Sequence, residues 1–186
     1  MDRSLKAGSW EKAIGRQLKG MKTLIIGFGK IGRLVADLLS PMEVEIIVFD
    51  PYSSDAIDYE VVDELAQALS MVDAVSLHAS GERQILGTEE FKRMKQGIYL
   101  LNAGRGNLID EEALLGAIHD GIVAGAWIDT FQDEPYRGPL RQCENVILTP
   151  HIGSYTHEGR KQMEIEAVRN LIKGLESVDS QENENR

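Results

Sequence analysis

The feature that most constrains the fold of this chain is an apolar strand that runs directly into three closely spaced glycines. Residues 23–26 are apolar or β-branched, and Gly27-Phe28-Gly29-Lys30-Ile31-Gly32 follows them. The next segment repeats its apolar residues at helical spacing. A turn of this kind between a strand and a helix predicts a tight bend at Gly27, room for a ligand at Gly29 and close packing of helix on strand at Gly32.

The glycine turn is also suited to bind phosphate. A helix N-terminus carries unpaired N–H groups and a partial positive charge, which attract an anion such as a pyrophosphate. The second apolar run, residues 44–49, ends in Asp50, and a carboxylate about 20 residues beyond the turn binds the ribose hydroxyls of a dinucleotide. Because a carboxylate repels a 2′-phosphate, the pattern favours NAD over NADP. The alternatives are a turn without a ligand and an Asp50-Pro51 pair that merely begins a turn.

Short apolar runs alternate with amphipathic segments along the rest of the chain. The runs are nearly continuous, which is typical of strands buried on both faces of a parallel sheet. We expect strands over residues 23–26, 44–49, 74–77, 98–101, 125–128 and 146–148. We expect helices over residues 31–39, 61–69, 89–94, 111–119 and about 158–175. This order predicts an α/β fold, a doubly wound parallel sheet with helices on both faces (the NAD-binding Rossmann fold), with ligands at the carboxyl ends of strands.

The two ends of the chain differ from this pattern. Residues 1–19 are expected to form a linker helix, because a few apolar residues recur there at roughly helical spacing. These residues are Leu5, Trp10, Ile14 and Leu18. Residues 20–176 form the expected nucleotide-binding domain. Residues 177–186 are polar and are expected to be a disordered tail.

The composition excludes several classes of protein. The net charge is −10, which argues against nucleic acid and anionic membranes as partners, because phosphate contacts need lysine and arginine. Cys143 is the single cysteine, so no internal disulfide or cysteine-rich metal site is expected, and a cytoplasmic setting fits best. No apolar run approaches the ~20 residues of a membrane span.

Three polar residues in the second half follow predicted strands. Arg105 lies between two glycines, which give it room to face a ligand, although a solvated loop arginine is the alternative. Asp129 ends a buried strand, and a buried acid needs a ligand or a donor. His151 follows the last strand. The carboxyl ends of parallel strands share one edge of the sheet, so all three lie where ligands bind.

At these points the sequence resembles the D-isomer-specific 2-hydroxyacid dehydrogenases. The matching stretches are GFGKIGR, the strand that ends in Asp50-Pro51-Tyr52, LLNAGRGNLIDEEAL, residues 127–135 and LTPHIGS. The resemblance covers roughly residues 20–175. The sequence of residues 79–81 and 155–175 is most similar to the phosphoglycerate dehydrogenase branch. It implies an NAD-dependent enzyme that transfers hydride between C2 of a 2-hydroxy acid and the nicotinamide ring.

The resemblance also implies a role for each catalytic residue. The histidine that matches His151 is the general acid and base, a task for which imidazole suits neutral pH. Glu134 matches the acid that orients this imidazole. Arg105 matches the arginine that holds the substrate carboxylate through its planar fork. No metal is implied.

The implied cofactor contacts extend over both halves of the chain. Lys30 and Ile31 match the pair that binds the pyrophosphate, Asp129 matches the acceptor of the cofactor carboxamide, and His78 either lines the pocket or plays no part. The full set is Gly27, Phe28, Gly29, Lys30, Ile31, Gly32, Asp50, His78, Ala103, Gly104, Asp129 and Gly153. The resemblance further implies a 2-hydroxy or 2-oxo acid as substrate and a homodimer.

Two departures from the family leave the function open. The loop at residues 78–83 is shorter than the family's, and no stretch matches its substrate domain. Because closure over the substrate excludes water, the domain alone should be a poor enzyme. The chain is therefore expected to be either the cofactor domain of a dehydrogenase or a standalone NAD-binding module, a sensor or regulatory partner without turnover.

Overall fold

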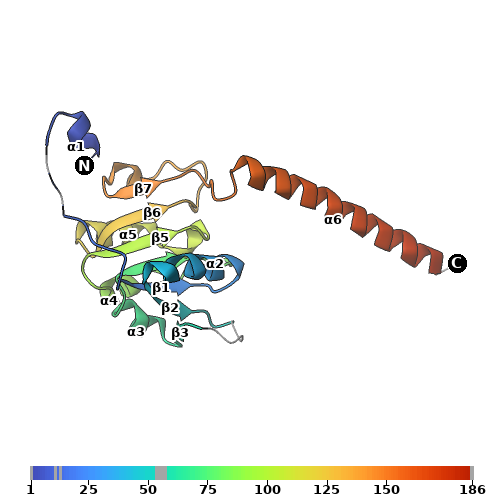
Figure 1. Ribbon diagram of the computed structural model, residues 1–186, viewed down its shortest axis with the longest axis horizontal. Coiled ribbons are helices and arrows are strands. Elements are labelled where there is room, and N and C mark those ends of the chain that lie inside the picture. The colour runs from blue at the N-terminus through green and yellow to red at the C-terminus, as the bar shows by residue number, and fades with distance from the viewer. Residues whose placement is uncertain (1, 11, 13, 53–57, 185–186) are drawn as a thin grey trace. The chain divides into compact units, whose positions relative to one another are not determined.

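The computed structural model describes residues 2–10, 12, 14–52 and 58–184. These residues divide into two compact units, residues 1–151 and residues 152–186. The first unit contains a seven-stranded parallel sheet in the order β3-β2-β1-β4-β5-β6-β7 (Figure 1). The order reverses between β1 and β4, which is the point where ligands bind in doubly wound sheets.

Six of the seven strands agree closely with the predicted apolar runs, and β3 was not predicted. The strands are β1 (Lys22–Ile26), β2 (Glu45–Phe49), β3 (Glu60–Val61), β4 (Ala74–Leu77), β5 (Ile98–Asn102), β6 (Val123–Ile128) and β7 (Val146–Leu148). The helices of the first unit are α1 (Asp2–Lys6), α2 (Lys30–Leu39), α3 (Leu65–Leu69), α4 (Thr88–Arg93) and α5 (Glu111–His119), with short 3₁₀ turns at Ser40–Met42, Gly106–Leu108 and Pro139–Gln142. The second unit holds α6 (His157–Glu184).

Helices cover both faces of the sheet, as predicted. Successive residues of β1 alternate between two buried clusters: Leu24 and Ile26 belong to one, and Ile25 belongs to the other. The first cluster includes residues of α3, α4 and α5, and the second includes Ala36 of α2. This alternation explains why the strands read as continuous apolar runs, since each strand packs on both sides.

Three predicted boundaries were wrong. Val61 lies in β3 beside Val48 of β2, and the helix predicted over residues 61–69 is reduced to α3. The helix predicted over residues 1–19 ends at Lys6, just before Gly8, whose φ of +85° does not continue a helix. The last helix does not stop near residue 175 but continues to Glu184, because the segment contains no glycine or proline after Gly174.

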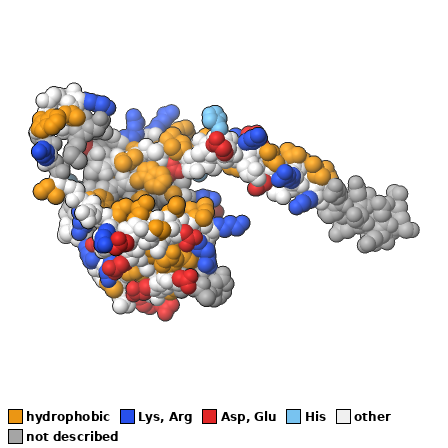
Figure 2. Space-filling model, in the orientation of Figure 1, with side chains coloured by type: hydrophobic (Ala, Val, Ile, Leu, Met, Phe, Trp, Pro, Cys, Tyr) orange, Lys and Arg blue, Asp and Glu red, His pale blue; other side chains and the backbone are white. Residues whose placement is uncertain are grey.

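Several apolar side chains of the first unit lie on its surface. Trp10 is 80% exposed and Ile14 is fully exposed. The outer side of α2 also exposes apolar residues, including Leu34 and Leu38, and Figure 2 shows apolar side chains gathered over this helix. Among the described residues, no helix combines the length and the apolar character needed to cross a membrane.

Candidate active site

The glycine turn between β1 and α2 is fixed by close backbone contacts. Gly27 has φ of +90°, and a Cβ there would lie 2.4 Å from the backbone N of Ala79. A Cβ on Gly32 would lie 2.2 Å from the carbonyl O of Gly27. Gly29 differs, because no atom lies within 4 Å of its Cβ position. Two of the glycines therefore hold the turn together, and the middle one leaves open space above it.

Asp50 joins the end of β2 to this turn. Its Oδ2 accepts a hydrogen bond of 2.7 Å from the backbone N–H of Phe28, and its Oδ1 accepts one of 2.9 Å from Tyr52. The residue thus begins a turn and also contacts the glycine loop. Two carboxylate oxygens have about four acceptor sites, so these bonds leave capacity for the hydroxyls of a ribose.

A cavity of about 640 Å³ opens beside the turn. Its lining includes Gly27, Gly29, Asp50, His78, Ser80 and Arg83. The loop at residues 78–83 therefore forms one wall of this cavity. Phe28 is not part of the lining, because its side chain is buried in the smaller apolar cluster.

His78 lines this cavity and has one buried ring nitrogen without a hydrogen-bond partner among the described residues. Its Nε2 lies 2.8 Å from the hydroxyl of Ser76, whereas its Nδ1 is buried and finds no hydrogen-bond partner among the described residues. Burial lowers the pKa of His78, so the imidazole is neutral at neutral pH. A buried polar atom without a partner is uncommon, which favours a ligand at this position.

The loop of residues 103–106 after β5, called here the arginine loop, is held by two hydrogen bonds to the side chain of Asn102. The buried amide of Asn102 accepts from the N–H of Gly104 at 3.1 Å and donates to the carbonyl of Arg105 at 3.1 Å. Ala103 and Gly104 lie in the same loop, which packs against the end of β4. The Arg105 side chain is exposed, and one Nη donates to the carbonyl of Gly104 at 2.9 Å.

Glu134 and His151 form the predicted pair. His151 Nδ1 lies 3.1 Å from Glu134 Oε2, so the other ring nitrogen, Nε2, points away from the carboxylate. The Phe131 N–H bound to Glu134, and next the His151 ring, hold the pKa of Glu134 below its usual value. The carboxylate is therefore ionised at neutral pH and can stabilise an imidazolium.

The backbone of His151 is also constrained. Its φ is +52°, in the left-handed region that is uncommon for a residue with a side chain. Its N–H donates to the carbonyl of Asp129 at 2.8 Å, which ties the histidine to the end of β6.

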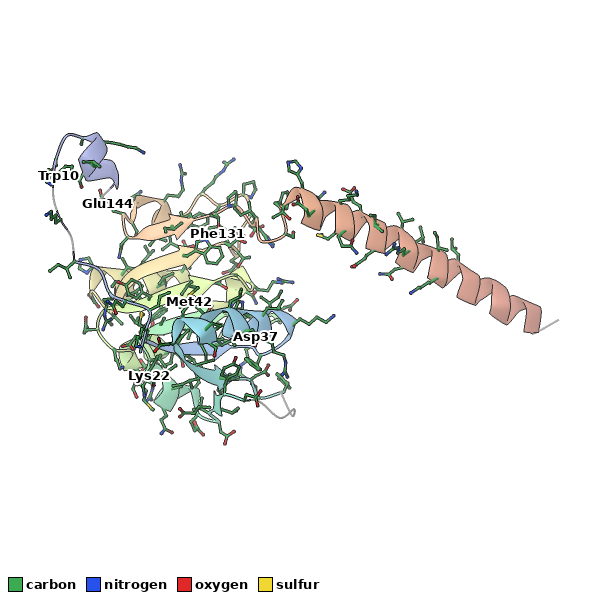
Figure 3. All side chains as sticks on the ribbon, viewed as in Figure 1. Trp10, Lys22, Asp37, Met42, Phe131 and Glu144 are labelled. Carbon is green, nitrogen blue, oxygen red and sulfur yellow. The ribbon has the colours of Figure 1, made fainter. Side chains whose placement is uncertain are left out.

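Tyr136 supports the loop that carries Glu134. Its ring stacks on Phe131, labelled in Figure 3, with the ring centroids 4.1 Å apart, and its hydroxyl accepts from the N–H of Leu140 at 3.1 Å. Burial, with the nearby Glu111 carboxylate, raises the pKa of Tyr136 to about 12. The phenol stays neutral, so it can keep packing in this loop without the cost of a buried charge.

Asp129 is 2% exposed and has the donor that its burial requires. The hydroxyl of Thr149 lies 2.5 Å from Asp129 Oδ1, and the indole N–H of Trp127 donates to the same hydroxyl at 2.9 Å. Sequence reasoning missed Ser76, Trp127 and Thr149. Only the alternation of side chains along β6 could have indicated that Trp127 lies on the same face as Asp129.

The predicted site residues come from the carboxyl ends of six strands. Gly27 follows β1, Asp50 follows β2 and His78 follows β4. The arginine loop, Asp129 and His151 follow β5, β6 and β7. Lys30 and Ile31 form the exposed first turn of α2. Gly153 belongs to the second unit, and its role stays a prediction.

Within the part of the chain that the structure describes, no cluster of His, Cys, Asp and Glu is placed to hold a metal ion.

Comparison with known proteins identifies the class. The family model of the D-isomer specific 2-hydroxyacid dehydrogenase NAD binding domain matches residues 1–153. The chain therefore belongs to the D-isomer-specific 2-hydroxyacid dehydrogenase family, and the matched part is its NAD-binding domain.

Individual relatives agree with this assignment. The chain is 38% identical to D-3-phosphoglycerate dehydrogenase 2 of Arabidopsis thaliana, over 93% of this chain and 30% of that protein. It is 35% identical to a glyoxylate reductase of Thermococcus litoralis, over 92% of this chain and 56% of that protein. A solved D-2-hydroxyisocaproate dehydrogenase matches with a TM-score of 0.85 at 28% identity, over 94% of this chain and 59% of that chain. The chain spans less than two thirds of the length of each relative.

The glycine contacts predict an asymmetric effect of alanine on stability. Gly32→Ala places a Cβ against the carbonyl O of Gly27, and neither backbone segment can move without opening the turn. We expect the free energy of unfolding to fall by about 1–3 kcal/mol, measured by urea denaturation. The control is Gly116→Ala in α5, where nothing lies within 4 Å and stability should hold or rise. Equal unfolding midpoints for the two variants would contradict this contact.

Proposed function

We propose that this chain is the cofactor domain of an NAD-dependent dehydrogenase that transfers hydride between C2 of a 2-hydroxy acid and nicotinamide. The observation that carries the proposal is the ionised Glu134 bound to His151 at the sheet edge that also holds the glycine turn. A domain that only bound a dinucleotide would have no need of an oriented imidazole. Relatives named as a phosphoglycerate dehydrogenase and a glyoxylate reductase support a small 2-hydroxy or 2-oxo acid as the substrate.

The residues present fit NAD. Gly29 leaves room above the turn, the α2 N-terminus offers backbone N–H groups, and Asp50 lies at the edge of the cavity. The orphan Nδ1 of His78 is a further polar group for the cofactor. When bound, NAD supplies the nicotinamide C4 that accepts or returns the hydride.

The side chains of this domain would handle the proton and the substrate carboxylate. His151 Nε2 takes the hydroxyl proton as the C2–H bond is broken, and the Glu134 carboxylate stabilises the resulting imidazolium. In the reverse direction the imidazolium returns that proton to the carbonyl oxygen. Arg105 would turn from the Gly104 carbonyl to the substrate carboxylate, which its guanidinium can bind through two parallel hydrogen bonds.

Cofactor choice provides the first test. The Asp50 carboxylate should repel a 2′-phosphate, so NADH should bind at least about tenfold more tightly than NADPH, a difference of about 1.4 kcal/mol. Asp50→Asn keeps one acceptor oxygen, removes the charge and should erase most of this preference. Isothermal titration calorimetry of both cofactors measures it, with the exposed Asp63→Asn as control. Equal affinities in the unmodified chain would contradict the role of Asp50, and no binding of either cofactor would end the proposal.

Turnover provides the second test. NADH oxidation is followed with glyoxylate and hydroxypyruvate, using the chain alone and fused to the substrate domain of a relative. His151→Asn should lower the rate of an active form by about 10²–10⁴ and leave NADH affinity unchanged. Asparagine is chosen because it tolerates the left-handed backbone at this position. NADH binding without turnover in either form would instead support the alternative, an NAD-binding module with a regulatory role.

We also propose a homodimer in a cytoplasmic setting. The exposed Trp10 and Ile14 provide apolar surface that a second copy would bury. Sedimentation equilibrium should then give twice the 20.7 kDa of one chain, and Trp10→Ala should shift the chain toward monomer. The control is Tyr52→Ala, another exposed aromatic residue. A monomer at high micromolar concentration would contradict the dimer.

A further inference from the structure

Two side chains beside the site have no part in the proposed reaction and yet form a chain of hydrogen bonds to Asp129. The indole Nε1–H of Trp127 donates to Thr149 Oγ1 at 2.9 Å, and Thr149 Oγ1 lies 2.5 Å from Asp129 Oδ1. Asp129 is almost fully buried, and Trp127 and Thr149 are half-buried. The two bonds are therefore partly shielded from competing water, which strengthens such bonds.

The sheet itself brings these residues together. Trp127 and Asp129 are two positions apart on β6 and its extension, so both side chains project from the same face. The parallel register pairs Ile128 with Leu148, and the N–H of the next residue, Thr149, donates to the carbonyl of Ile128 at 3.1 Å, which holds Thr149 at the end of β6. Thr149 thus lies beside Asp129 on that face.

Hydrogen-bond chemistry fixes which atom donates and which accepts in this series of bonds from Trp127 to Asp129. An indole nitrogen can only donate, so the Thr149 oxygen must accept from Trp127. A threonine hydroxyl has one hydrogen, and Thr149 donates it to the carboxylate oxygen Oδ1 of Asp129. The bond from Trp127 therefore fixes the hydroxyl so that its hydrogen points at Asp129 Oδ1.

We propose that Trp127 and Thr149 are positioning residues that orient the Asp129 carboxylate toward the nicotinamide carboxamide. This inference rests on the proposed function and on the cofactor contact that the family resemblance implies for Asp129, which is to accept a hydrogen bond from that carboxamide. A hydroxyl fixed on one oxygen restrains rotation of the carboxylate, so the acceptor presented to the ring is set before the cofactor binds. Such preorganisation strengthens binding because less side-chain conformational entropy is lost when the cofactor binds.

The proposal predicts an effect at one end of the cofactor. The adenosine and pyrophosphate groups would be held by the glycine turn and Asp50, at the ends of β1 and β2. Trp127 and Thr149 lie at β6 and β7, toward the other edge of the sheet. ADP-ribose lacks the nicotinamide ring, so its affinity should not depend on the hydrogen bonds from Trp127 and Thr149 to Asp129. The affinity of NADH should depend on them.

The experiment compares the affinities of NADH and ADP-ribose in three variants by calorimetry. Thr149→Val removes the hydroxyl and keeps the shape, and should weaken NADH about tenfold. Trp127→Phe keeps an aromatic ring and removes the N–H, and should weaken NADH about threefold. Thr149→Ser restores the hydroxyl and should return NADH affinity to within about twofold of the unmodified chain. ADP-ribose affinity should stay unchanged in all three.

A double variant tests whether the two residues act through one carboxylate. If they do, Trp127→Phe should add nothing in the Thr149→Val background, because the bond it removes no longer leads to Asp129. The matched control is Tyr99→Phe, which removes a polar group from neighbouring β5 and makes no bond to these residues. It should leave the affinities of both ligands unchanged.

Each outcome has one meaning. Weaker NADH with unchanged ADP-ribose, and recovery in Thr149→Ser, supports the positioning role. Equal loss for both ligands would show a general structural effect and overturn it, and so would unchanged NADH affinity in Thr149→Val. If the unmodified chain binds neither ligand, the proposed function fails first, and the inference fails with it.

Discussion

The contact between Gly32 and the carbonyl of Gly27 is the constraint on which the rest of the site depends. It draws the start of α2 against the end of β1, with only 2.2 Å between the place of a Cβ and the carbonyl oxygen. The N–H groups at the start of α2 consequently face the edge of the sheet where the other loops end. Asp50 fixes the same turn from the side of β2 through the N–H of Phe28. A dinucleotide would meet a backbone surface whose shape is already set before it binds.

The parts of the fold that depend on local chemistry could be predicted from the sequence. Strands packed on both faces leave a continuous apolar run, so β4 and β7 were predicted at their observed boundaries. The two-residue strand β3 was missed, because Glu60 and Val61 join the sheet only through pairing with β2. The helix predicted over residues 1–19 rested on apolar spacing alone, and spacing alone does not stabilise a helix.

In the candidate site, too, local sequence patterns predicted some residues, whereas contacts between distant segments were not predictable. The sequence indicated Asp129 because a buried acid needs a partner, and the structure supplies that partner as Thr149. The identity of the partner depends on the register between β6 and β7, which lie 20 residues apart at these two positions. No local pattern contains that register. The same holds for Ser76, whose contact with His78 depends on how the end of β4 turns.

The site has a nucleotide half, at the glycine turn, and a reaction half, at Glu134 and His151, and the two differ in whether backbone or side chains form them. The nucleotide half consists largely of backbone, and the close backbone contacts at Gly27 and Gly32 leave no room for a Cβ at these two positions. The reaction half consists of side chains on loops, and the pair of Glu134 and His151 stays roughly half exposed, at 40% and 53%. Water at such a pair screens its charges and competes for the transferred proton. The proposed hydride transfer at this edge would consequently require a cover over the imidazole, whereas the proposed NAD binding at the glycine turn would not. Under the proposed function, cofactor binding would therefore need only this domain, whereas turnover would also need a segment that covers His151.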